Sequence, residues 1–191
     1  ADDESGDARK FTQAVARRCA EAGVEFRYGT EVLGFDKAGD RILGVQTLTE
    51  GRHQVLRADS YVLCLGSFSA VLARRLGLFL NIYPAKGYSL PVPVKNPDAA
   101  FQVSLTDDEY KLVYSRLGDR IRVAGTAELN GYTRNLDFIR CRAIVRRAAE
   151  ILPEAGHWDQ AEYWTGLRPT TPSNVPYIGK SHFNNLYLNT G

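Results

Sequence analysis

The residues with the clearest chemical potential lie at positions 164–172, where the sequence reads WTGLRPTTP. Arg168 stands there between a strand-forming, aromatic-led stretch and a proline, so its backbone is stiff. A planar guanidinium on stiff backbone can donate two parallel hydrogen bonds to a carboxylate. Arg168 is therefore a candidate for binding the carboxylate of a substrate. The residues alone also allow a structural alternative, in which Arg168 pairs with Glu162 or Asp159 at the end of a strand.

A second candidate site follows an apolar stretch at residues 60–65. This stretch is apolar almost throughout, which is typical of a strand buried on both faces. It ends at Gly66 and Ser67, just before a helical pattern over residues 70–76. Glycine at the end of a buried strand lets the backbone approach a ligand closely, and ligands of α/β sheets bind outside the carboxyl ends of strands. An ordinary strand-to-helix turn is the alternative interpretation.

The elements that must position these residues follow from the spacing of apolar side chains. The pattern predicts a helix over residues 7–22 that ends at Gly23, and another over residues 135–152 that Pro153 follows. Predicted strands occupy residues 24–28, 31–35, 42–47, 54–56, 60–65, 85–90, 111–116, 120–126 and 185–189. The strands at residues 111–116 and 120–126 are joined by a tight turn at residues 117–119, so we expect an antiparallel sheet with the later helix over one face.

Composition excludes several classes of function. The chain has 191 residues, 44% of them hydrophobic, which is enough for one domain or two small interleaved ones. Its net charge of +2 is close to neutral and its basic residues are scattered, so no nucleic-acid partner is expected. No apolar run approaches the roughly 18 residues of a membrane-spanning helix, so any membrane association would be peripheral.

The cysteines and histidines do not predict a metal site or a disulfide framework. Cys19, Cys64 and Cys141 are odd in number, far apart and set in apolar-periodic segments. The three histidines share no metal-ligand spacing with them or with each other. We therefore expect no bound metal, a reducing cytoplasmic compartment, and Cys64 as a small buried hydrophobic residue.

Both ends of the sequence suggest an internal part of a longer protein. The chain contains no methionine, and its first six residues are acidic rather than basic and apolar, unlike a signal peptide. Thr190 and Gly191 look like the start of a strand-to-helix turn, and no helix follows them. We interpret the chain as a fragment.

Together these segments resemble the D-amino-acid oxidase superfamily of FAD-dependent oxidoreductases, and within it the bacterial D-amino-acid dehydrogenases. The matching stretches are residues 6–26, 61–69, 86–89, 120–128 and 164–169. The likeness spans essentially the whole chain, and its last motif is specific. The chain departs from the family in lacking a strand, GxGxxG and helix unit to seat the pyrophosphate. It also stops before the glycine-rich turn that closes over the flavin in this family.

The resemblance implies a fold of the α/β plus α+β class. It places a partial, Rossmann-like FAD-binding domain, without the GxGxxG unit, at residues 1–82. An antiparallel-sheet substrate-binding domain, packed by a helix, would occupy residues 83–163. Residues 164–191 would carry the substrate arginine and return to the FAD domain. On the same pattern the backbone of Val32 lies near the adenine, and Gly66 with Ser67 lies near the pyrophosphate.

For the substrate, the resemblance assigns Arg168 to the carboxylate. Tyr110 or Tyr114 could supply a hydroxyl to the same carboxylate, and the spacing of the following turn does not decide between them. As an equal alternative, both tyrosines contact no substrate and are aromatic side chains of the core or the sheet surface, on one face of a strand. Residues 86–88, another stretch of the family pattern, also fit a turn at a sheet edge.

The implied activity is oxidation of D-amino acids to 2-keto acids and ammonia, by hydride transfer to flavin. Electrons would pass to an acceptor such as a quinone, and the parent enzyme could lie peripherally at the inner face of a bacterial membrane. One alternative is a glycine or amine oxidase of the same superfamily. Another is a catalytically silent substrate-binding module in this truncated form. Because the phosphate-binding unit is missing, we expect FAD in the full-length parent and an inactive, FAD-free isolated fragment.

Overall fold

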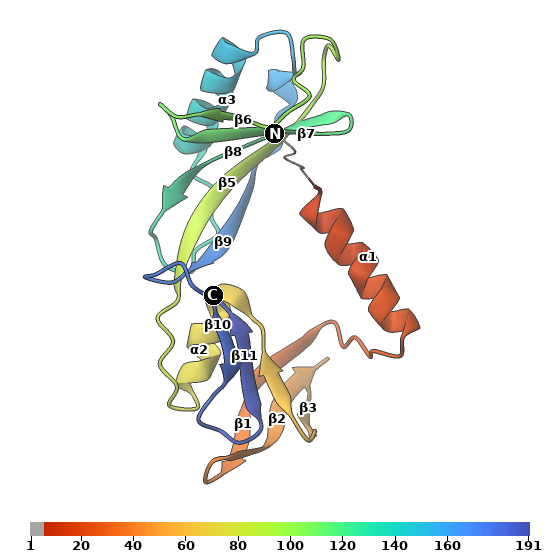
Figure 1. The fold of residues 1–191 in the computed structure, drawn as a ribbon, viewed down its shortest axis with the longest axis vertical. Coiled ribbons are helices and arrows are strands. Elements are labelled where there is room, and N and C mark those ends of the chain that lie inside the picture. Colours follow the sequence, from red (N-terminus) through yellow and green to blue (C-terminus); the bar gives the residue numbers. More distant parts are fainter. Residues whose placement is uncertain (1–5) are drawn as a thin grey trace. The chain divides into compact units, whose positions relative to one another are not determined.

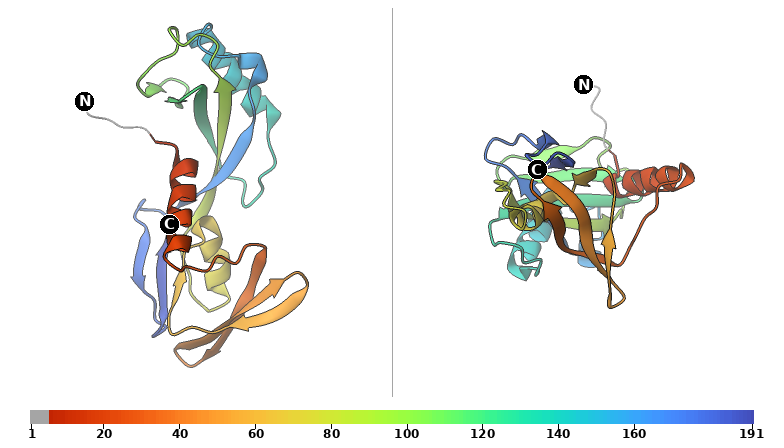
Figure 2. Two further views of the ribbon diagram at one scale, coloured as in Figure 1. Left: turned by 90° about the vertical axis from the view of Figure 1, so that its right-hand side faces the viewer. Right: turned by 90° about the horizontal axis from the view of Figure 1, so that it is seen from below.

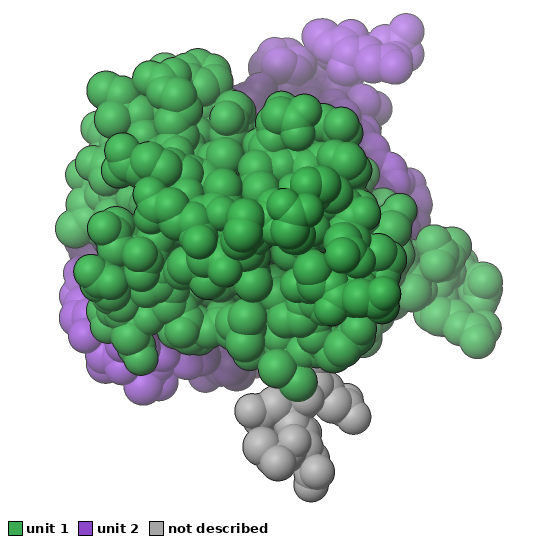
Figure 3. All heavy atoms as spheres, turned by 90° about the horizontal axis from the view of Figure 1, so that it is seen from above, with its two compact units in different colours: residues 1–24, 85–167 green, residues 25–84, 168–191 purple. Residues whose placement is uncertain are grey.

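The computed structural model describes residues 6–191 (Figures 1 and 2), and the acidic start of the chain at residues 1–5 lies outside the described residues. The chain divides into two compact units (Figure 3). Unit 1 consists of Ala1–Val24 and Ala85–Leu167, and unit 2 of Glu25–Pro84 and Arg168–Gly191. Each unit is thus built from two separate stretches of chain. The functional domains assigned from the family likeness stay a prediction.

Unit 1 is built around a five-stranded sheet with the order β6-β7-β8-β5-β9. Its strands are β5 (Tyr83–Pro93), β6 (Leu105–Asp107), β7 (Leu112–Leu117), β8 (Arg120–Glu128) and β9 (Trp164–Thr170). The pairs β5–β8, β6–β7 and β7–β8 are antiparallel. The β7–β8 hairpin confirms the predicted tight turn, whereas β6 was not predicted from the sequence. Gly118, at φ +67°, forms the tight turn between β7 and β8 because glycine adopts this conformation without strain.

Helix α3 (Phe138–Ile151) covers one face of this sheet (Figure 1). It begins later than the apolar pattern predicted, because Asp137 caps it by accepting the N–H groups of Ile139 and Arg140. Its buried side chains are Cys141, Ile144 and Ala148, and they pack with Leu90, Ile121 and Val123 of the sheet. A short 3-10 helix, η2 (Trp158–Gln160), packs beside this core.

Helix α1 (Ala8–Glu21) confirms the first predicted helix. Asp7 caps its start, and Gly23, at φ +92°, ends it. None of its residues is buried. No helix in the described part of the chain is long and apolar enough to cross a membrane.

Unit 2 contains two three-stranded sheets. The first is an antiparallel sheet of β1 (Thr30–Ala38), β2 (Arg41–Thr49) and β3 (Arg52–Leu56), close to the predicted hairpins. The strand predicted at residues 24–28 is wrong: residues 24–27 are irregular and Tyr28 lies in a turn with Gly29 at φ +65°. The apolar residues Val24, Phe26 and Tyr28 are exposed, and residues 24–28 belong to none of the sheets in the described part of the chain, so no strand pairing stabilises them there.

The second sheet of unit 2 has the order β10-β11-β4. It consists of β10 (Tyr177–Lys180), β11 (Leu186–Thr190) and β4 (Tyr61–Leu63), and η1 (Gly66–Phe68) and α2 (Ser69–Arg74) follow β4. Helix α2 lies beside these strands in Figure 1 and in the two views of Figure 2. Leu72 and Ala73 of α2 pack there with Leu63, Leu186 and Phe183.

The structure corrects the prediction for the apolar stretch at residues 60–65. Only residues 61–63 form a strand, and it lies at the edge of its sheet. Val62 is 60% exposed while Leu63 faces the core, so this strand is not buried on both faces. Cys64 is exposed, and the prediction that it is a buried hydrophobic residue is wrong.

Candidate functional site

The carboxyl ends of β4 and β11 lie side by side in unit 2. The two strands are parallel, with Leu63 opposite Leu188. Each strand runs into a glycine with positive φ, Gly66 at +52° and Gly191 at +111°. Ligands of α/β sheets bind outside such strand ends, where glycine lets the backbone approach them. Gly66 thus lies in a turn that follows a strand, and its contact with a ligand stays a prediction.

Two buried hydroxyls hold this turn by hydrogen bonds. The sequence did not predict that these residues contact the turn. Ser69 Oγ accepts the N–H of Leu65 at 3.0 Å and lies 2.7 Å from Thr190 Oγ1. Thr190 Oγ1 in turn donates to the carbonyl of Gly66 at 3.2 Å. No local signal pairs these two residues, since 121 positions separate them.

The segment that follows Arg168 packs against the same turn. Pro169 Cγ lies 3.7 Å from the place that a Cβ of Gly66 would occupy. The Arg168 side chain is exposed, and no ion pair of it is found within residues 6–191. Glu162, one partner of the structural alternative, is bound by Arg120 at 2.5 Å. The guanidinium of Arg168 is therefore not paired with any carboxylate of the described chain.

The other residues predicted to bind cofactor also belong to unit 2. Ser67 is buried in the turn after β4. Val32 lies in β1, at a register shift opposite β2, and packs against the core that contains Leu63. Val32, Gly66, Ser67 and Arg168 are thus parts of one compact unit.

Tyr110 and Tyr114 belong to unit 1 and differ from each other. Tyr114 is 1% exposed, packs edge-on against Phe101 and belongs to the core, and burial raises the pKa of its hydroxyl. Within the described part of the chain, that hydroxyl has no hydrogen-bond partner. Tyr110 lies in the turn before β7 rather than on the strand, half-exposed, with the guanidinium of Arg147 4.2 Å above its ring. A contact of either residue with substrate stays a prediction.

Residues 86–88 form a buried polar network instead of a turn at a sheet edge. Strand β5 lies between β8 and β9, so that interpretation is wrong. Lys86 Nζ, 2% exposed, lies 2.8 Å from Glu128 Oε2 and donates to the carbonyl of Asn135 at 3.0 Å. Tyr88 Oη donates to the same carboxylate at 2.6 Å. The hydrogen bonds from Lys86 and Tyr88 lower the pKa of Glu128 to about 2, and the bond to Glu128 raises the pKa of Lys86.

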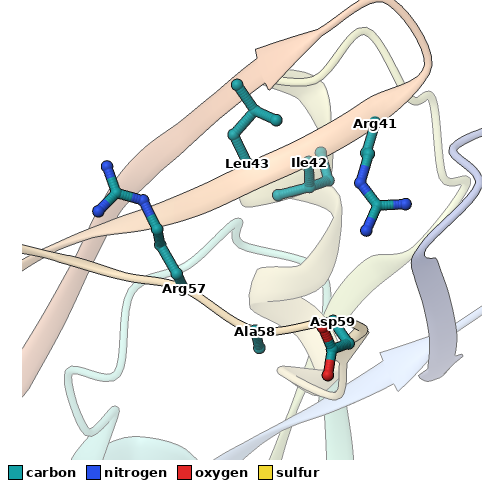
Figure 4. A pocket seen from close by; sticks show the side chains of 6 residues that line it. All are labelled: Arg41, Ile42, Leu43, Arg57, Ala58 and Asp59. Carbon is teal, nitrogen blue, oxygen red and sulfur yellow. The ribbon is translucent and has the colours of Figure 1, made fainter.

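A shallow hollow of about 380 Å³ lies elsewhere on unit 2 (Figure 4). Its lining consists of Arg41, Ile42, Leu43, Arg57, Ala58 and Asp59. None of the predicted site residues is among them, so the hollow is not the candidate site. In the described part of the chain, no three His, Cys, Asp or Glu side chains lie close enough together to hold a metal ion.

Comparison with known proteins gives these observations a context. A family model described as FAD dependent oxidoreductase matches residues 1–191. The D-amino acid dehydrogenase of Dechloromonas aromatica is 50% identical over 99% of this chain and 46% of its own length. That of Paramagnetospirillum magneticum is 52% identical over 100% of this chain and 44% of its own length. The chain thus spans less than half of these relatives.

Solved structures show the fold. Glycine oxidase from Geobacillus kaustophilus superposes with a TM-score of 0.79 at 26% identity, over 96% of this chain and 48% of that one. L-proline dehydrogenase from P. horikoshii has a TM-score of 0.81 at 20% identity, over 97% and 50%. These likenesses confirm the predicted fold class, a partial FAD-binding, Rossmann-like part with an antiparallel sheet packed by a helix.

Proposed function

This chain belongs to the FAD dependent oxidoreductase family, and from that premise we propose that it is part of a D-amino-acid dehydrogenase. Such an enzyme oxidises D-amino acids to 2-keto acids and ammonia. Relatives with this name at 50% and 52% identity support the substrate class. The observation that carries the proposal is Arg168, an exposed guanidinium without a carboxylate partner in the described chain, next to the Pro169 that packs on the Gly66 turn.

The residues present fit part of an FAD site. Gly66 has a positive φ and only Pro169 near its Cβ position, so its backbone can lie close to a ligand. We assign the pyrophosphate to Gly66 and Ser67 and the adenine to the backbone of Val32. When bound, FAD supplies the acceptor for the substrate hydride.

Arg168 has the main role toward the substrate in this proposal. Its two parallel N–H groups bind the carboxylate and thereby fix the orientation of the amino acid about Cα. With a neutral amine, the Cα hydrogen leaves as hydride and the resulting imino acid is hydrolysed. No general base is needed for this chemistry. The contribution of the protein is positioning, so the planar fork of Arg168 matters more than its charge alone.

Three finer points belong to the same proposal. Electrons pass from the flavin to a quinone or similar acceptor, and the enzyme associates peripherally with the cytoplasmic face of a bacterial membrane. The isolated chain does not retain one FAD per molecule, because its sequence contains no GxGxxG unit. An absorbance spectrum of the purified chain tests the last point, since a yellow preparation with one flavin per chain would contradict it. Dye reduction measured beside oxygen consumption separates a dehydrogenase from a glycine or amine oxidase.

Substitution of Arg168 in the full-length protein tests the central assignment. Arg168→Lys should raise KM for D-amino acids by about 10- to 100-fold, because an ammonium cannot reproduce the two-donor fork. Arg168→Ala should lower kcat/KM by a factor that corresponds to a loss of about 3–5 kcal/mol in transition-state stabilisation, because the buried substrate carboxylate then has no partner. Flavin occupancy should stay unchanged in both variants.

The matched control is Arg120→Lys, which alters an arginine that binds a carboxylate of the protein itself, Glu162. It should leave KM unchanged. A near-normal KM and kcat in Arg168→Lys and Arg168→Ala would show that Arg168 is a structural residue and that the substrate site lies elsewhere.

A further inference from the structure

The two hydroxyls beneath the Gly66 turn are almost inaccessible to solvent. Ser69, the first residue of α2, is 0% exposed, and Thr190, the last residue of β11, is 6% exposed. A hydroxyl in such a place needs a partner for its proton and for a lone pair, because burying an unpaired polar group costs about 1–3 kcal/mol. Within residues 6–191, both hydroxyls find these partners in each other and in the backbone of the turn.

The hydrogen bonds run in one direction. Each hydroxyl has a single proton to donate. Thr190 gives its proton to the carbonyl of Gly66, which can only accept. The proton between the two hydroxyls must therefore come from Ser69, whose oxygen accepts the N–H of Leu65 in turn. The order is Leu65 N–H, Ser69, Thr190 and Gly66 carbonyl, and no proton in it is left without an acceptor.

This chain of bonds holds two peptide groups of the turn, the one between Cys64 and Leu65 and the one between Gly66 and Ser67. Gly66 has φ +52°, a region that glycine leaves easily because it has no Cβ to restrict it. The peptide between Gly66 and Ser67 is planar and trans, so a carbonyl held toward Thr190 sets the plane of the whole group. Thr190 thus determines how the turn presents its backbone, although 124 residues separate it from Gly66.

We propose that Ser69 and Thr190 are positioning residues for FAD, which hold the Gly66–Ser67 peptide in the orientation that the pyrophosphate requires. This inference rests on the proposed function. Loss of either hydroxyl should free the turn to adopt other conformations, so part of the binding energy of FAD is spent on ordering it again. The consequence is weaker FAD binding without a change in the contacts that FAD makes.

The test uses the full-length protein, stripped of flavin and titrated with FAD while visible absorbance and the melting temperature are recorded. Thr190→Val replaces the hydroxyl by a methyl group of similar size and should raise the Kd for FAD about tenfold or more. Thr190→Ser keeps the hydroxyl and should bind FAD nearly as the parent does. Ser69→Ala removes the bonds to the Leu65 N–H and to Thr190 but leaves the bond from Thr190 to Gly66, so it should weaken FAD binding less than Thr190→Val does.

Thr47→Val is the matched control in the same unit. Thr47 is 2% exposed and donates to the carbonyl of Gln54 on the neighbouring strand, away from the turn. It should lower the melting temperature of the flavin-free protein as much as Thr190→Val does, but leave the Kd for FAD unchanged. Equal Kd values in Thr47→Val and Thr190→Val would overturn the inference. If Thr190→Val does not fold, Ser69→Ala decides in its place. A parent that binds no FAD at all would instead overturn the proposed function.

Discussion

Among the residues of unit 1, Lys86 is the one whose replacement should lower the free energy of unfolding most. Its ammonium is buried, bound to the carboxylate of Glu128 and to the carbonyl of Asn135. Lys86→Met keeps the length of the side chain but leaves a half-buried carboxylate without its nearest counter-ion, with only the more distant Arg140 at 4.0 Å in the described chain, and a carbonyl without its donor. Breaking one half of such a pair costs about 3–5 kcal/mol. Against a typical stability of 5–15 kcal/mol, this is a large loss.

The lowered pKa of Glu128 reflects the same interactions. The pKa of Glu128 is lowered from 4.5 to about 2, with the hydrogen bond from Lys86 as the largest cause. At about 1.36 kcal/mol per pKa unit, the interactions of the charged carboxylate amount to about 3 kcal/mol. Lys86→Met/Glu128→Gln removes both charges, so we expect the double variant to lose about 1–3 kcal/mol less than the sum of the two single variants.

The assay is urea unfolding followed by tryptophan fluorescence. Both tryptophans of the chain, Trp158 and Trp164, lie in unit 1, so the signal reports on the unit that holds the network. Lys95→Met is the control, because Lys95 forms an ion pair of the same 2.8 Å length with Glu154, but exposed to solvent. It should cost less than about 1 kcal/mol. A loss in Lys86→Met no larger than in Lys95→Met would refute the reasoning.

Two further predictions concern the same unit. A carboxylate whose pKa is lowered on folding stabilises the protein at pH values above its unfolded pKa. The stabilisation due to Glu128 should therefore disappear as the pH falls from 4.5 to 2. In Glu128→Gln, urea midpoints measured across this range should lack this contribution to the pH dependence. Some dependence should persist in that variant, because Arg147 lowers the pKa of Asp107 as well. Tyr114→Phe should be neutral or stabilise by up to about 1 kcal/mol, since its buried hydroxyl has no partner in the described chain, whereas Tyr88→Phe should cost about 1–3 kcal/mol. Equal losses in the two tyrosine variants would show that the hydroxyl of Tyr114 is bound.

Elements with local signals could be predicted from the sequence. The helices at Ala8–Glu21 and Phe138–Ile151 follow from apolar spacing and a following glycine or proline, whereas the aspartate caps that set their first residues were not predicted. The hairpin between β7 and β8 follows from the turn residues around Gly118. Each of these signals involves residues only a few positions apart, and its physical effect acts over the same short range.

Elements that depend on a distant partner could not be predicted in this way. Residues 24–28 have strand-forming side chains but no strand to pair with, and the apolar stretch at residues 60–65 became a short, half-exposed edge strand. Lys86 and Glu128 pair across β5 and β8 because the register of the sheet makes them neighbours. Nothing in their sequence context requires this pairing, since it depends on which strands meet and in what order.

For the candidate site, too, local signals could be predicted from the sequence and contacts between distant residues could not. Arg168 and Gly66 could be named as candidates from the sequence, because residue type, flanking proline and position after a strand are compatible with these roles, and the family resemblance then favoured them over the structural alternatives. Only the tertiary structure decided that Pro169 packs on Gly66 and that Ser69 and Thr190 hold the turn. It also decided that Tyr114 lies in the core. Stiffness and charge belong to single residues, whereas burial and hydrogen-bond partners arise only when distant parts of the chain meet.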